Sequence, residues 1–478
     1  MKFSKHFNLN KDQTELDFVD ISLEKDTPLF IDPYALSKRN DIFSIECHSH
    51  VVDFFENVMK AITNNEHDKA KFLLNNLHEP NETRLGLSSK KPKGRGMAGE
   101  QSRDLYKRLS ESRAAKTGFL RDLEDCQLII PGINRDKISD VTTNIIKQHL
   151  ALYTKTQCDF YDIPTSRVVL GPFWNHNEGK WGQDYFDLPV HKGKKILLVP
   201  KAIVRYTLAY DYQDYYNHFV LNFLQEEEIH AGSSLVKTLK NGKKKVTKKD
   251  LKKKYPLTKE FLYTFSRDNI SVLDSYKQTK GITIAPLSSE EIEKRSPESS
   301  NQLHNLEYYK NLLGGISIGN KDASKYHNGI KGMLTAIFYP SLIYPKKEEQ
   351  IHEGRKRIDI TFSNADGKGF FSRLSRQIPC PFIIVECKNY KADLENPELD
   401  QISGRFSPPR GQFGIIVCRK IDDKKLFNKR CGDTAQDQRG CIIALDDKDI
   451  LQLLEWRINE EEHKIDAFLD FLYRKLVM

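Results

Sequence analysis

The pattern of hydrophobic and polar positions is clearest in the last third of the chain. The spacing over 323–338 predicts a helix, and Pro340 is expected to end it. RKRIDITFSN, 355–364, alternates apolar and polar residues and predicts a half-buried strand, while PFIIVECK, 381–388, predicts a buried strand. A weaker strand is expected near 348–353. The apolar face of the predicted helix is made of Tyr326, Ile330, Met333, Leu334 and Ile337.

The same pattern continues almost to the end of the chain. NPELDQISGRF, 396–406, predicts a helix with Asn396 as the N-cap and Pro397 at the first helical position. Buried strands are expected in QFGIIVCR and GCIIALDD, and a helix in DKDILQLLEWRI. DTAQDQRG, 433–440, is expected to be a connection, with Asp433 as a cap. Strand–helix–strand order favours parallel neighbours, so these elements predict an α/β domain.

The pattern divides the chain into three parts. Residues 1–285 are expected to be a mixed α/β or α+β region of one or two subdomains. The polar stretch 286–305 is expected to be a linker, and 306–478 the α/β domain. In the first part, helices are predicted in CHSHVVDFFENVMKAITNN and in VTTNIIKQHLALY, the second capped by Ser139 or Asp140. ILLV predicts a short buried strand.

A glycine-rich loop resembles a nucleotide site only in its spacing. Gly94, Gly96 and Gly99 have the spacing G-x-G-x-x-G, which binds dinucleotides where a strand comes directly before it. The preceding residues, SSKKPK, do not read as a strand, so a basic, flexible loop is expected instead. No P-loop motif is present in the sequence, and any ATP-driven motor is expected to be a separate protein.

Positive charge is concentrated in one segment. The 478 residues are 38% hydrophobic and 29% charged, with a net charge of +9. KTLKNGKKKVTKKDLKKK, 237–254, holds ten lysines and one aspartate and therefore carries the whole excess. It is either a grip on a phosphate backbone, with Lys243, Lys244 and Lys245 as candidate contacts, or a solvated, mobile loop. It has no aromatic residue, so base stacking is not expected of it.

Hydropathy and cysteine spacing exclude several classes of protein. No run of about 18 apolar residues is present, so no membrane span is expected. The start of the sequence lacks the apolar run of a signal peptide, which predicts a cytoplasmic protein. None of the eight cysteines forms a C-x-x-C pair, so they are expected to be buried and reduced rather than ligands of a structural zinc ion.

Charged residues end the predicted strand FIIVECK. Glu386 and Lys388 are two apart and share a face, whereas Cys387 points to the other. An ordinary surface ion pair is one interpretation. The second depends on Asp359, which a neighbouring strand would bring beside Glu386: the two acids would hold a divalent cation, Mg²⁺ or Mn²⁺. Lys388 would then orient or help to deprotonate a water for metal-assisted phosphodiester hydrolysis.

The motifs RIDI and VECK, followed by a helix bearing Gln401, resemble the restriction-endonuclease-like PD-(D/E)XK nuclease superfamily. The resemblance covers roughly residues 305–460. It implies a mixed central sheet flanked by helices and a metal-dependent nuclease, usually acting on DNA. It also implies that Asp359 and Glu386 are metal ligands, that the carbonyl of Cys387 is a further ligand, and that Lys388 is catalytic. Gln401 would support the site or touch a backbone phosphate.

Two features depart from the superfamily pattern. Ile358 stands where many members have proline before the aspartate. The first helix lacks the acid that some members contribute, because Asp322 lies at its very start and Tyr326 and His327 occupy its body. A third carboxylate would come from Glu349 or Glu353, or be absent, so one-metal and two-metal chemistry both stay open. His327 is expected to be packed or at the surface rather than a ligand.

The expected function is a Mg²⁺-dependent endonuclease that acts on DNA in restriction or antiphage defence. Arg405 and Arg410, in or beside the predicted loop RFSPPRG, are candidate phosphate contacts, and the N-terminal region would recognise a target or restrain the nuclease. A homo-oligomer and partner proteins of a defence system are expected. Two alternatives stay open: a nuclease of the same chemistry that acts on RNA, and a non-catalytic nucleic-acid-binding module in a larger defence complex.

Overall fold

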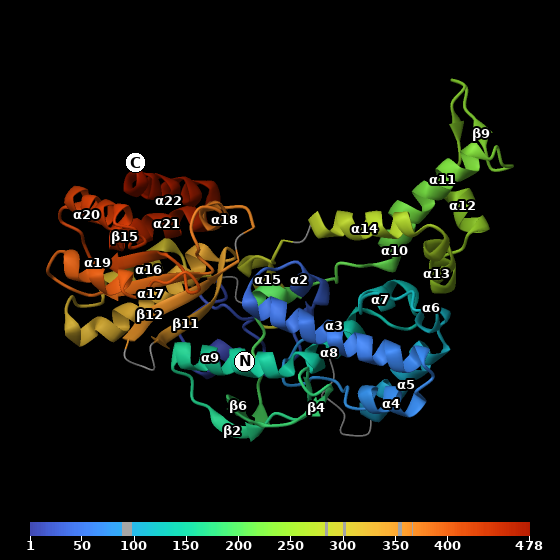
Figure 1. Cartoon of the computed structure of the whole chain (residues 1–478), viewed down its shortest axis with the longest axis horizontal. Coiled ribbons are helices and arrows are strands. Elements are labelled where there is room, and N and C mark those ends of the chain that lie inside the picture. Colours follow the sequence, from blue (N-terminus) through green and yellow to red (C-terminus); the bar gives the residue numbers. More distant parts are fainter. Residues whose placement is uncertain (88–97, 283–284, 300–302, 352–355, 366) are drawn as a thin grey trace.

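The computed structural model describes residues 1–87, 98–282, 285–299, 303–351, 356–365 and 367–478. The described residues pack around two large hydrophobic cores. One is built mainly from residues before 285 and the other mainly from residues after 305. The C-terminal sheet lies at one end of the long axis and the β9–β10 hairpin at the other (Figure 1).

A five-stranded sheet forms the centre of the C-terminal part, in the order β11-β12-β13-β14-β15. The first three strands are antiparallel neighbours, and the last three are parallel. The fold is therefore mixed α/β, as predicted. The strands are β11 (Leu342–Ile351), β12 (Lys356–Asn364), β13 (Phe382–Lys388), β14 (Phe413–Cys418) and β15 (Cys441–Asp446).

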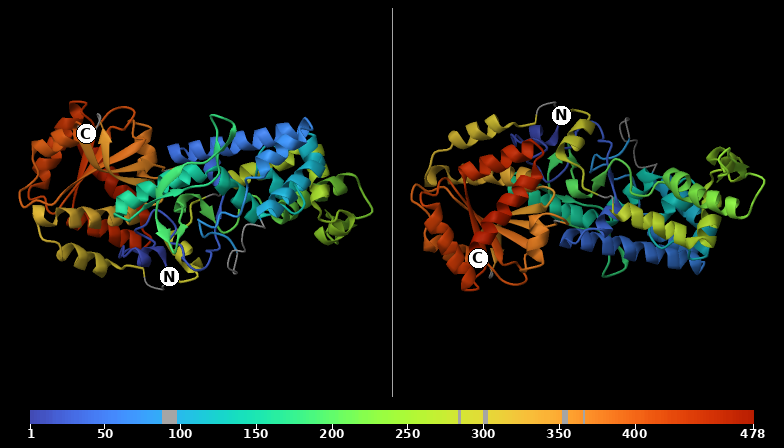
Figure 2. Two further views of the ribbon diagram at one scale, coloured as in Figure 1. Left: turned by 90° about the horizontal axis from the view of Figure 1, so that it is seen from below. Right: turned by 90° about the horizontal axis from the view of Figure 1, so that it is seen from above.

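Helices cover both faces of this sheet (Figure 2). Helix α19 connects β13 to β14, and α20 connects β14 to β15, so each parallel pair has a helical crossover. Strands between two helical layers are buried on both faces, which explains why β14 and β15 are buried at every position. The helices are α16 (Leu306–Gly314), α17 (Ala323–Phe338), α18 (Phe370–Ser375), α19 (Asn396–Ser403), α20 (Lys424–Gln436), α21 (Asp447–Ile458) and α22 (Glu462–Val477).

The connection predicted for 433–440 is wrong in its first half. Asp433 lies inside α20 rather than at a cap. This helix turns few large apolar side chains to the core, among them Phe427 and Cys431, so its hydrophobic period is weak. Helices α16, α18 and α22 were also not predicted.

The predicted cap of α19 is off by one residue. Glu395 is the N-cap, and Asn396 is already helical. The side chain of Glu395 accepts a hydrogen bond from the backbone N–H of Glu398, and the side chain of Glu398 accepts one from Glu395. This reciprocal capping box satisfies two N–H groups that the helix leaves free, which a single Asn cap does not.

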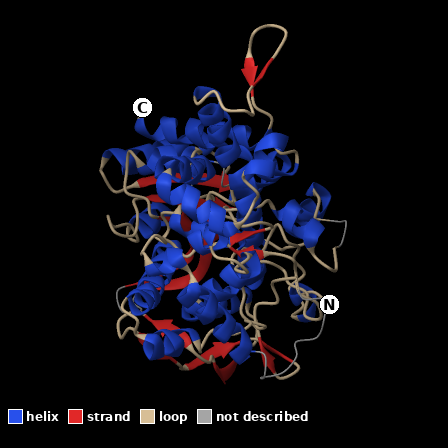
Figure 3. Ribbon diagram, turned by 90° about the vertical axis from the view of Figure 1, so that its right-hand side faces the viewer, coloured by secondary structure: helices blue, strands red, loops and turns tan. Residues whose placement is uncertain are grey.

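Helices dominate the N-terminal part, and its strands are short two-stranded pairs (Figure 3). The helices are α1 (Phe3–His6), α2 (Pro33–Ser37), α3 (Ile42–Thr63), α4 (His67–Leu74), α5 (Ala98–Glu111), α6 (Arg113–Lys116), α7 (Asp125–Ile129), α8 (Arg135–Ile145), α9 (Lys147–Tyr161), α10 (Tyr212–Tyr215), α11 (Leu221–His230), α12 (Lys248–Lys254), α13 (Lys259–Asp268), α14 (Ile270–Ile282) and α15 (Ser289–Arg295). The paired strands are β1 (Phe30–Ile31) with β8 (Val204–Arg205), β2 (Ser166–Val169) with β5 (Tyr185–Leu188), β3 (Phe173–Asn175) with β4 (Lys180–Gly182), β6 (Val190–His191) with β7 (Lys194–Lys195), and β9 (Lys237–Thr238) with β10 (Lys244–Lys245).

The helix predicted in CHSHVVDFFENVMKAITNN is confirmed as the greater part of α3. The strand predicted in ILLV, 196–199, is wrong. These residues are buried, but their backbone groups bond one at a time to different partners. Leu197 N donates to Glu82 O at 2.9 Å, and Leu198 N donates to Thr154 Oγ1 at 2.9 Å. A buried apolar run has the same pattern in a strand and in a core-crossing loop, which is why the sequence misled.

The cap predicted at Ser139 or Asp140 is wrong because α8 begins earlier. Its N-cap is Asn134, whose side chain accepts a hydrogen bond from Lys137 N at 3.1 Å. Ser139 Oγ instead accepts the N–H of Ile31 at 2.9 Å, which ties α8 to β1. Of the glycine-rich loop, Gly94 and Gly96 lie outside the described residues, and Gly99 falls in α5.

The two parts of the chain are joined by more than the stretch 286–305. That stretch contains α15, whose Ile292 is buried in the N-terminal core. Helix α9 lies beside β11, where Gln157 Nε2 donates to Pro345 O at 3.2 Å. Lys331 on α17 donates to Phe160 O at 3.0 Å. The N-terminal part therefore packs directly on the edge strand β11 and on α17. Both elements belong to the C-terminal part, which contains the site described below.

None of the described helices combines the length and the hydrophobicity that a membrane span requires.

Candidate active site

The structure brings together the two acids that the sequence placed on neighbouring strands. In the antiparallel pair β12–β13, Ile360 is opposite Val385, so the register places Asp359 beside Glu386. Asp359 Oδ2 accepts a hydrogen bond from Cys387 N at 2.9 Å, which fixes the aspartate against the end of β13. Glu386 is 1% exposed. Two carboxylates from neighbouring strands thus lie side by side near the end of β13, and that of Glu386 is buried.

Gln401 on α19 connects the acid to the lysine. Lys388 Nζ donates to Gln401 Oε1 at 2.7 Å, and Gln401 Nε2 donates to Glu386 Oε2 at 3.0 Å. A lysine only donates, so it fixes the orientation of the amide, which then presents its N–H to the glutamate. Lys388 Nζ also lies 3.8 Å from Glu386 Oε2. The four predicted catalytic residues therefore lie together.

One oxygen of Glu386 is left without a hydrogen bond from any described residue. This atom, Oε1, is buried. Its nearest described cation is Arg405 Nε, 3.7 Å away and itself without a hydrogen bond. The two form a loose ion pair that leaves the carboxylate oxygen unsatisfied, and a buried acceptor in that state is costly. Arg405 therefore lies at the site. Arg410 is held beside it, because Arg410 Nε donates to Arg405 O at 3.0 Å.

Burial, and then the neighbouring Asp359, raise the pKa of Glu386 to about 8. Lys388 and Arg405 act in the opposite direction but do not outweigh these two effects. A carboxyl group in a dry environment beside a second acid holds its proton, because two unscreened negative charges repel. A cation at this point would relieve both penalties.

The carbonyl of Cys387, predicted as a further ligand, also faces a partner. His327 Nε2 on α17 lies 3.0 Å from this oxygen. A carbonyl only accepts, so Nε2 carries a proton in this contact. Burial lowers the pKa of His327, which keeps the ring neutral. His327 is packed, as predicted, but it touches the site, and no sequence pattern showed this contact. The Cys387 side chain is buried.

The candidate third acids lie in different places. Asp322 pairs with Lys325 at 2.8 Å, and its Oδ2 accepts a hydrogen bond from Ser317 N at 3.3 Å. Glu349 Oε2 accepts a hydrogen bond from Thr361 Oγ1 at 2.8 Å. Thr361 is two residues from Asp359, so Glu349 lies over the same face of the sheet. Glu353 lies outside the described residues.

The predicted lysine contacts do not join the site. Lys243, Lys244 and Lys245 are exposed on the β9–β10 hairpin, at the opposite end of the molecule from β13 (Figure 1). Contact of both regions with one nucleic acid would therefore require a long ligand.

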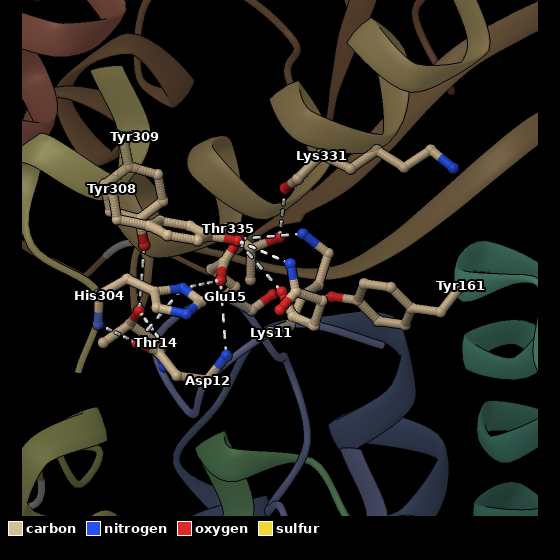
Figure 4. Close-up of polar contacts among 11 residues, drawn as sticks. Lys11, Asp12, Thr14, Glu15, Tyr161, His304, Tyr308, Tyr309, Lys331 and Thr335 are labelled. Carbon is tan, nitrogen blue, oxygen red and sulfur yellow. Dashed lines mark hydrogen bonds and ion pairs between the residues drawn. The ribbon is translucent and has the colours of Figure 1, made fainter. Parts of the chain in front are cut away.

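A second polar cluster was missed by sequence reasoning (Figure 4). Asp12, Glu15 and His304 each offer one atom that can bind a metal, and these three atoms lie within 4.8 Å of one another. Among the described residues, this is the one such group of three. Glu15 Oε1 binds Lys11 Nζ at 2.9 Å, and Glu15 Oε2 binds His304 Nδ1 at 2.7 Å. The backbone and hydroxyl of Thr14 donate to Asp12. Because the carboxylates are already satisfied by protein donors, we interpret the cluster as an ionic latch rather than a metal centre.

The latch lies where the N-terminal segment meets α17. A Cβ at position 332 would be 2.3 Å from Lys11 Nζ and 2.6 Å from Glu15 Oε1, so any side chain there would displace these two groups. Burial alone would raise the pKa of Glu15, but Lys11 and His304 outweigh it and lower this pKa below 4.5. The sequence gave no signal, because Glu15 and His304 are 289 residues apart.

Replacing Glu15 with Gln is expected to lower the free energy of unfolding by about 2 kcal/mol at neutral pH, because a buried charged acceptor is lost. Because the pKa of Glu15 is lower in the folded than in the unfolded protein, its charge stabilises the fold at pH values above the unfolded pKa. This stabilisation is lost as the pH falls below about 4.5. The difference from wild type should therefore shrink in acid. Urea denaturation at pH 7 and pH 4 measures it. Glu56→Gln is the control, since Glu56 pairs with Lys60 at the same spacing but is exposed; an equal loss in both variants contradicts the latch.

Comparison with known proteins identifies only part of the chain. Residues 8–211 match a family described as a domain of unknown function (DUF8370). This match covers less than half of the chain and lies within the N-terminal part. No curated protein and no solved structure matches the chain. The site at Asp359 and Glu386 lies outside the matched residues, so its interpretation depends on its own geometry.

Proposed function

We propose that the protein is a metal-dependent endonuclease that hydrolyses phosphodiester bonds in DNA at the site formed by Asp359, Glu386, Lys388 and Gln401. The observation that carries this proposal is the buried, unsatisfied Glu386 Oε1 beside a second carboxylate. Natural folds rarely keep such an atom without a function. The mixed sheet with helices on both faces and the order of its strands are compatible with a restriction-endonuclease-like core.

The donor set fits a hard divalent cation. Asp359 and Glu386 would hold it, and the Cys387 carbonyl is a further oxygen at the same strand end. Oxygen donors suit Mg²⁺ and Mn²⁺ better than softer metals. Arg405, at 3.7 Å, partly compensates Glu386 but leaves Oε1 without a hydrogen bond.

The residues of the chain divide the work of hydrolysis. When bound, Mg²⁺ neutralises charge on the phosphate and makes a water more acidic. Gln401 holds Lys388 Nζ beside Glu386, where the ammonium group can orient the attacking water and stabilise charge that develops on the phosphate oxygens. Attack of that water on phosphorus forms one P–O bond and breaks another. The water gives up a proton and the leaving oxygen takes one up, which yields a phosphate monoester and a free hydroxyl. Arg405 offers a further positive charge for the phosphate.

The protein's partners and setting remain part of the proposal. One site per chain cuts one strand, so a homo-oligomer would provide two sites for a double-strand break. A restriction or antiphage role, with partner proteins, is our expectation for such an enzyme. The N-terminal part, which packs on β11 and α17, would restrain or direct the nuclease.

The proposal is tested by cleavage assays on plasmid, linear and single-stranded DNA and on RNA, with Mg²⁺, Mn²⁺ or EDTA. We expect DNA cleavage that EDTA abolishes. Asp359→Asn should reduce the rate by at least about 100-fold, because even outer partners of a metal site are worth 10–100-fold. Asp400→Asn, on the exposed side of α19, is the matched control and should cut normally. Cleavage of RNA alone would favour the alternative substrate, and equal rates in the two variants would reject the site.

A further inference from the structure

The lysine-rich segment forms an ordered arm. We define the lysine arm as residues 237–254, which comprise β9, β10 and α12. It follows α11, and its β9–β10 hairpin projects from the rest of the molecule (Figure 1). The hairpin register pairs Lys244 with Thr238 and Lys245 with Lys237. The segment therefore has regular secondary structure on both sides of an exposed turn at residues 239–243.

The base of the lysine arm is fixed to α11. Val246 and Leu251 are fully buried. Gln225 Nε2 donates to Val246 O at 2.6 Å. Glu228 accepts hydrogen bonds from Lys254 Nζ and from the hydroxyl of Tyr255, the residue that follows the arm. These contacts hold the arm in a defined position while its tip remains in solvent.

Most of the charge on the lysine arm is not compensated. Three of its ten lysines are held by the protein: Lys237 by Asp250, Lys254 by Glu228, and Lys248 by the carbonyl of Asn217. The other seven form no ion pair with a described residue; they are Lys240, Lys243, Lys244, Lys245, Lys249, Lys252 and Lys253. Clustered like charges repel one another, so a fixed arm of this kind is stabilised by an anionic partner.

The composition of the lysine arm indicates which anion it fits. It contains no aromatic residue, which argues against stacking on the bases of a single strand. Its exposed large apolar residue is Leu239, so it offers little surface for insertion into a lipid layer. Several exposed ammonium groups on a protruding hairpin and a short helix can contact several phosphates of one backbone. A duplex backbone is the partner that meets these requirements.

We propose that the lysine arm is a second, sequence-independent binding site for the phosphate backbone of duplex DNA, remote from the candidate active site. The choice of DNA rests on the proposed function, whereas the charge and the geometry of the arm are independent of it. Since the arm and β13 lie at opposite ends of the long axis, one duplex reaches both only if it spans the molecule (Figure 1). The arm therefore tethers long DNA and raises its local concentration at the active site.

The first experiment measures binding of full-length protein to a fluorescent duplex in EDTA, so that no cutting occurs, over a series of salt concentrations. The test variant replaces Lys243, Lys244 and Lys245 with Gln. Its matched control replaces three other exposed lysines without described ion pairs, Lys107, Lys192 and Lys194. We expect the test variant to lose at least about tenfold in affinity and its log–log salt slope to fall by about 2–3, since each phosphate contact contributes about 0.9.

The control variant should bind nearly as well as wild type. Equal weakening of both variants, unchanged binding of the test variant, no binding by wild type, or equal affinity of the arm for polyglutamate would each overturn the proposal. Circular dichroism confirms that the variants fold. The substituted lysines are exposed and make no side-chain contacts that support the base of the arm.

The second experiment measures cleavage of duplexes of increasing length in Mg²⁺. Wild type should cut long duplexes faster than short ones at low DNA concentration, and the test variant should lose this preference while it still cuts short duplexes at the wild-type rate. A protein that binds through the arm but never cuts contradicts the proposed function alone. If the test and control variants both cut normally and with the same length preference, the result contradicts only the proposal that the lysine arm binds DNA.

Discussion

Lys388→Met is expected to abolish most DNA cleavage while leaving divalent-cation binding intact. Methionine keeps an unbranched side chain that is one atom shorter and removes the ammonium group that Gln401 holds at 2.7 Å. A positioned group that assists proton transfer or charge stabilisation contributes roughly 10²–10⁴ to a rate, so a loss of this size is expected in single-turnover assays. Asp359 and Glu386 remain in place, and the affinity for Mn²⁺ should change less than about threefold.

Lys391→Met is the matched control for this prediction. Lys391 is exposed and follows the same strand by three residues, so its replacement changes the charge near the site without touching Glu386 or Gln401. It should cut at nearly the wild-type rate. If Lys388→Met also cut normally, Lys388 would only be a structural partner of Gln401. If it lost cation binding as well, its role would be to maintain the acids.

Glu386→Gln is expected to stabilise the protein in the absence of metal and to remove its stabilisation by metal. The pKa of Glu386 is raised from 4.5 to about 8 by burial and by Asp359. A raised carboxyl pKa means that the folded state binds more protons than the unfolded state between these values, so wild type loses stability as the pH rises through this window. At pH 8 or above, the penalty is on the order of 4 kcal/mol, and the neutral glutamine avoids it.

Thermal denaturation between pH 5 and pH 9 checks this result. Without metal, the melting temperature of Glu386→Gln should exceed that of wild type by a margin that grows toward pH 8. Saturating Mg²⁺ should raise the melting temperature of wild type and leave the variant nearly unchanged, because a ligand stabilises only the state that binds it. A wild-type protein that Mg²⁺ does not stabilise, together with a variant that is less stable at every pH, would show that Glu386 is held by ordinary protein contacts.

The strands of the site were predictable because their residue patterns are strong. The alternation of apolar and polar residues predicted β12, and a run of apolar residues predicted β13. The helix predicted after β13, which is α19, carries Gln401. The prediction that Asp359 lies beside Glu386 then required two assumptions only: side chains alternate between the two faces of a strand, and strands that follow each other in the sequence pair with each other. The site could be assembled from local patterns because three of its four residues lie within 16 positions of each other.

Other features depend on tertiary packing that no local pattern contains. His327 reaches the Cys387 carbonyl because of how α17 is rotated on the sheet, and its spacing in the helix fits a core or a surface position equally well. The latch joins residues 289 positions apart. Helix α20 was missed because a polar helix that covers a sheet edge has a weak hydrophobic period. Long-range contacts and weakly amphipathic helices thus define the limit of the sequence analysis.

In the proposed function, the N-terminal part would restrain the enzyme through its contact with α17. The latch at Glu15 holds the N-terminal segment against α17, and α17 carries His327 to the site. A shift of this helix would therefore move a group that touches the Cys387 carbonyl. The residues matched by the domain of unknown function include Glu15, so this contact lies in part within that domain.

The most direct test of the central claim is calorimetric titration of Mn²⁺ into metal-free protein in the absence of nucleic acid. We expect saturable binding by wild type, by Lys388→Met and by Asp400→Asn, and at least about tenfold weaker binding by Glu386→Gln and Asp359→Asn. Binding that is unchanged in Glu386→Gln, or no saturable binding by wild type, would contradict the assignment of Asp359 and Glu386 as a metal site.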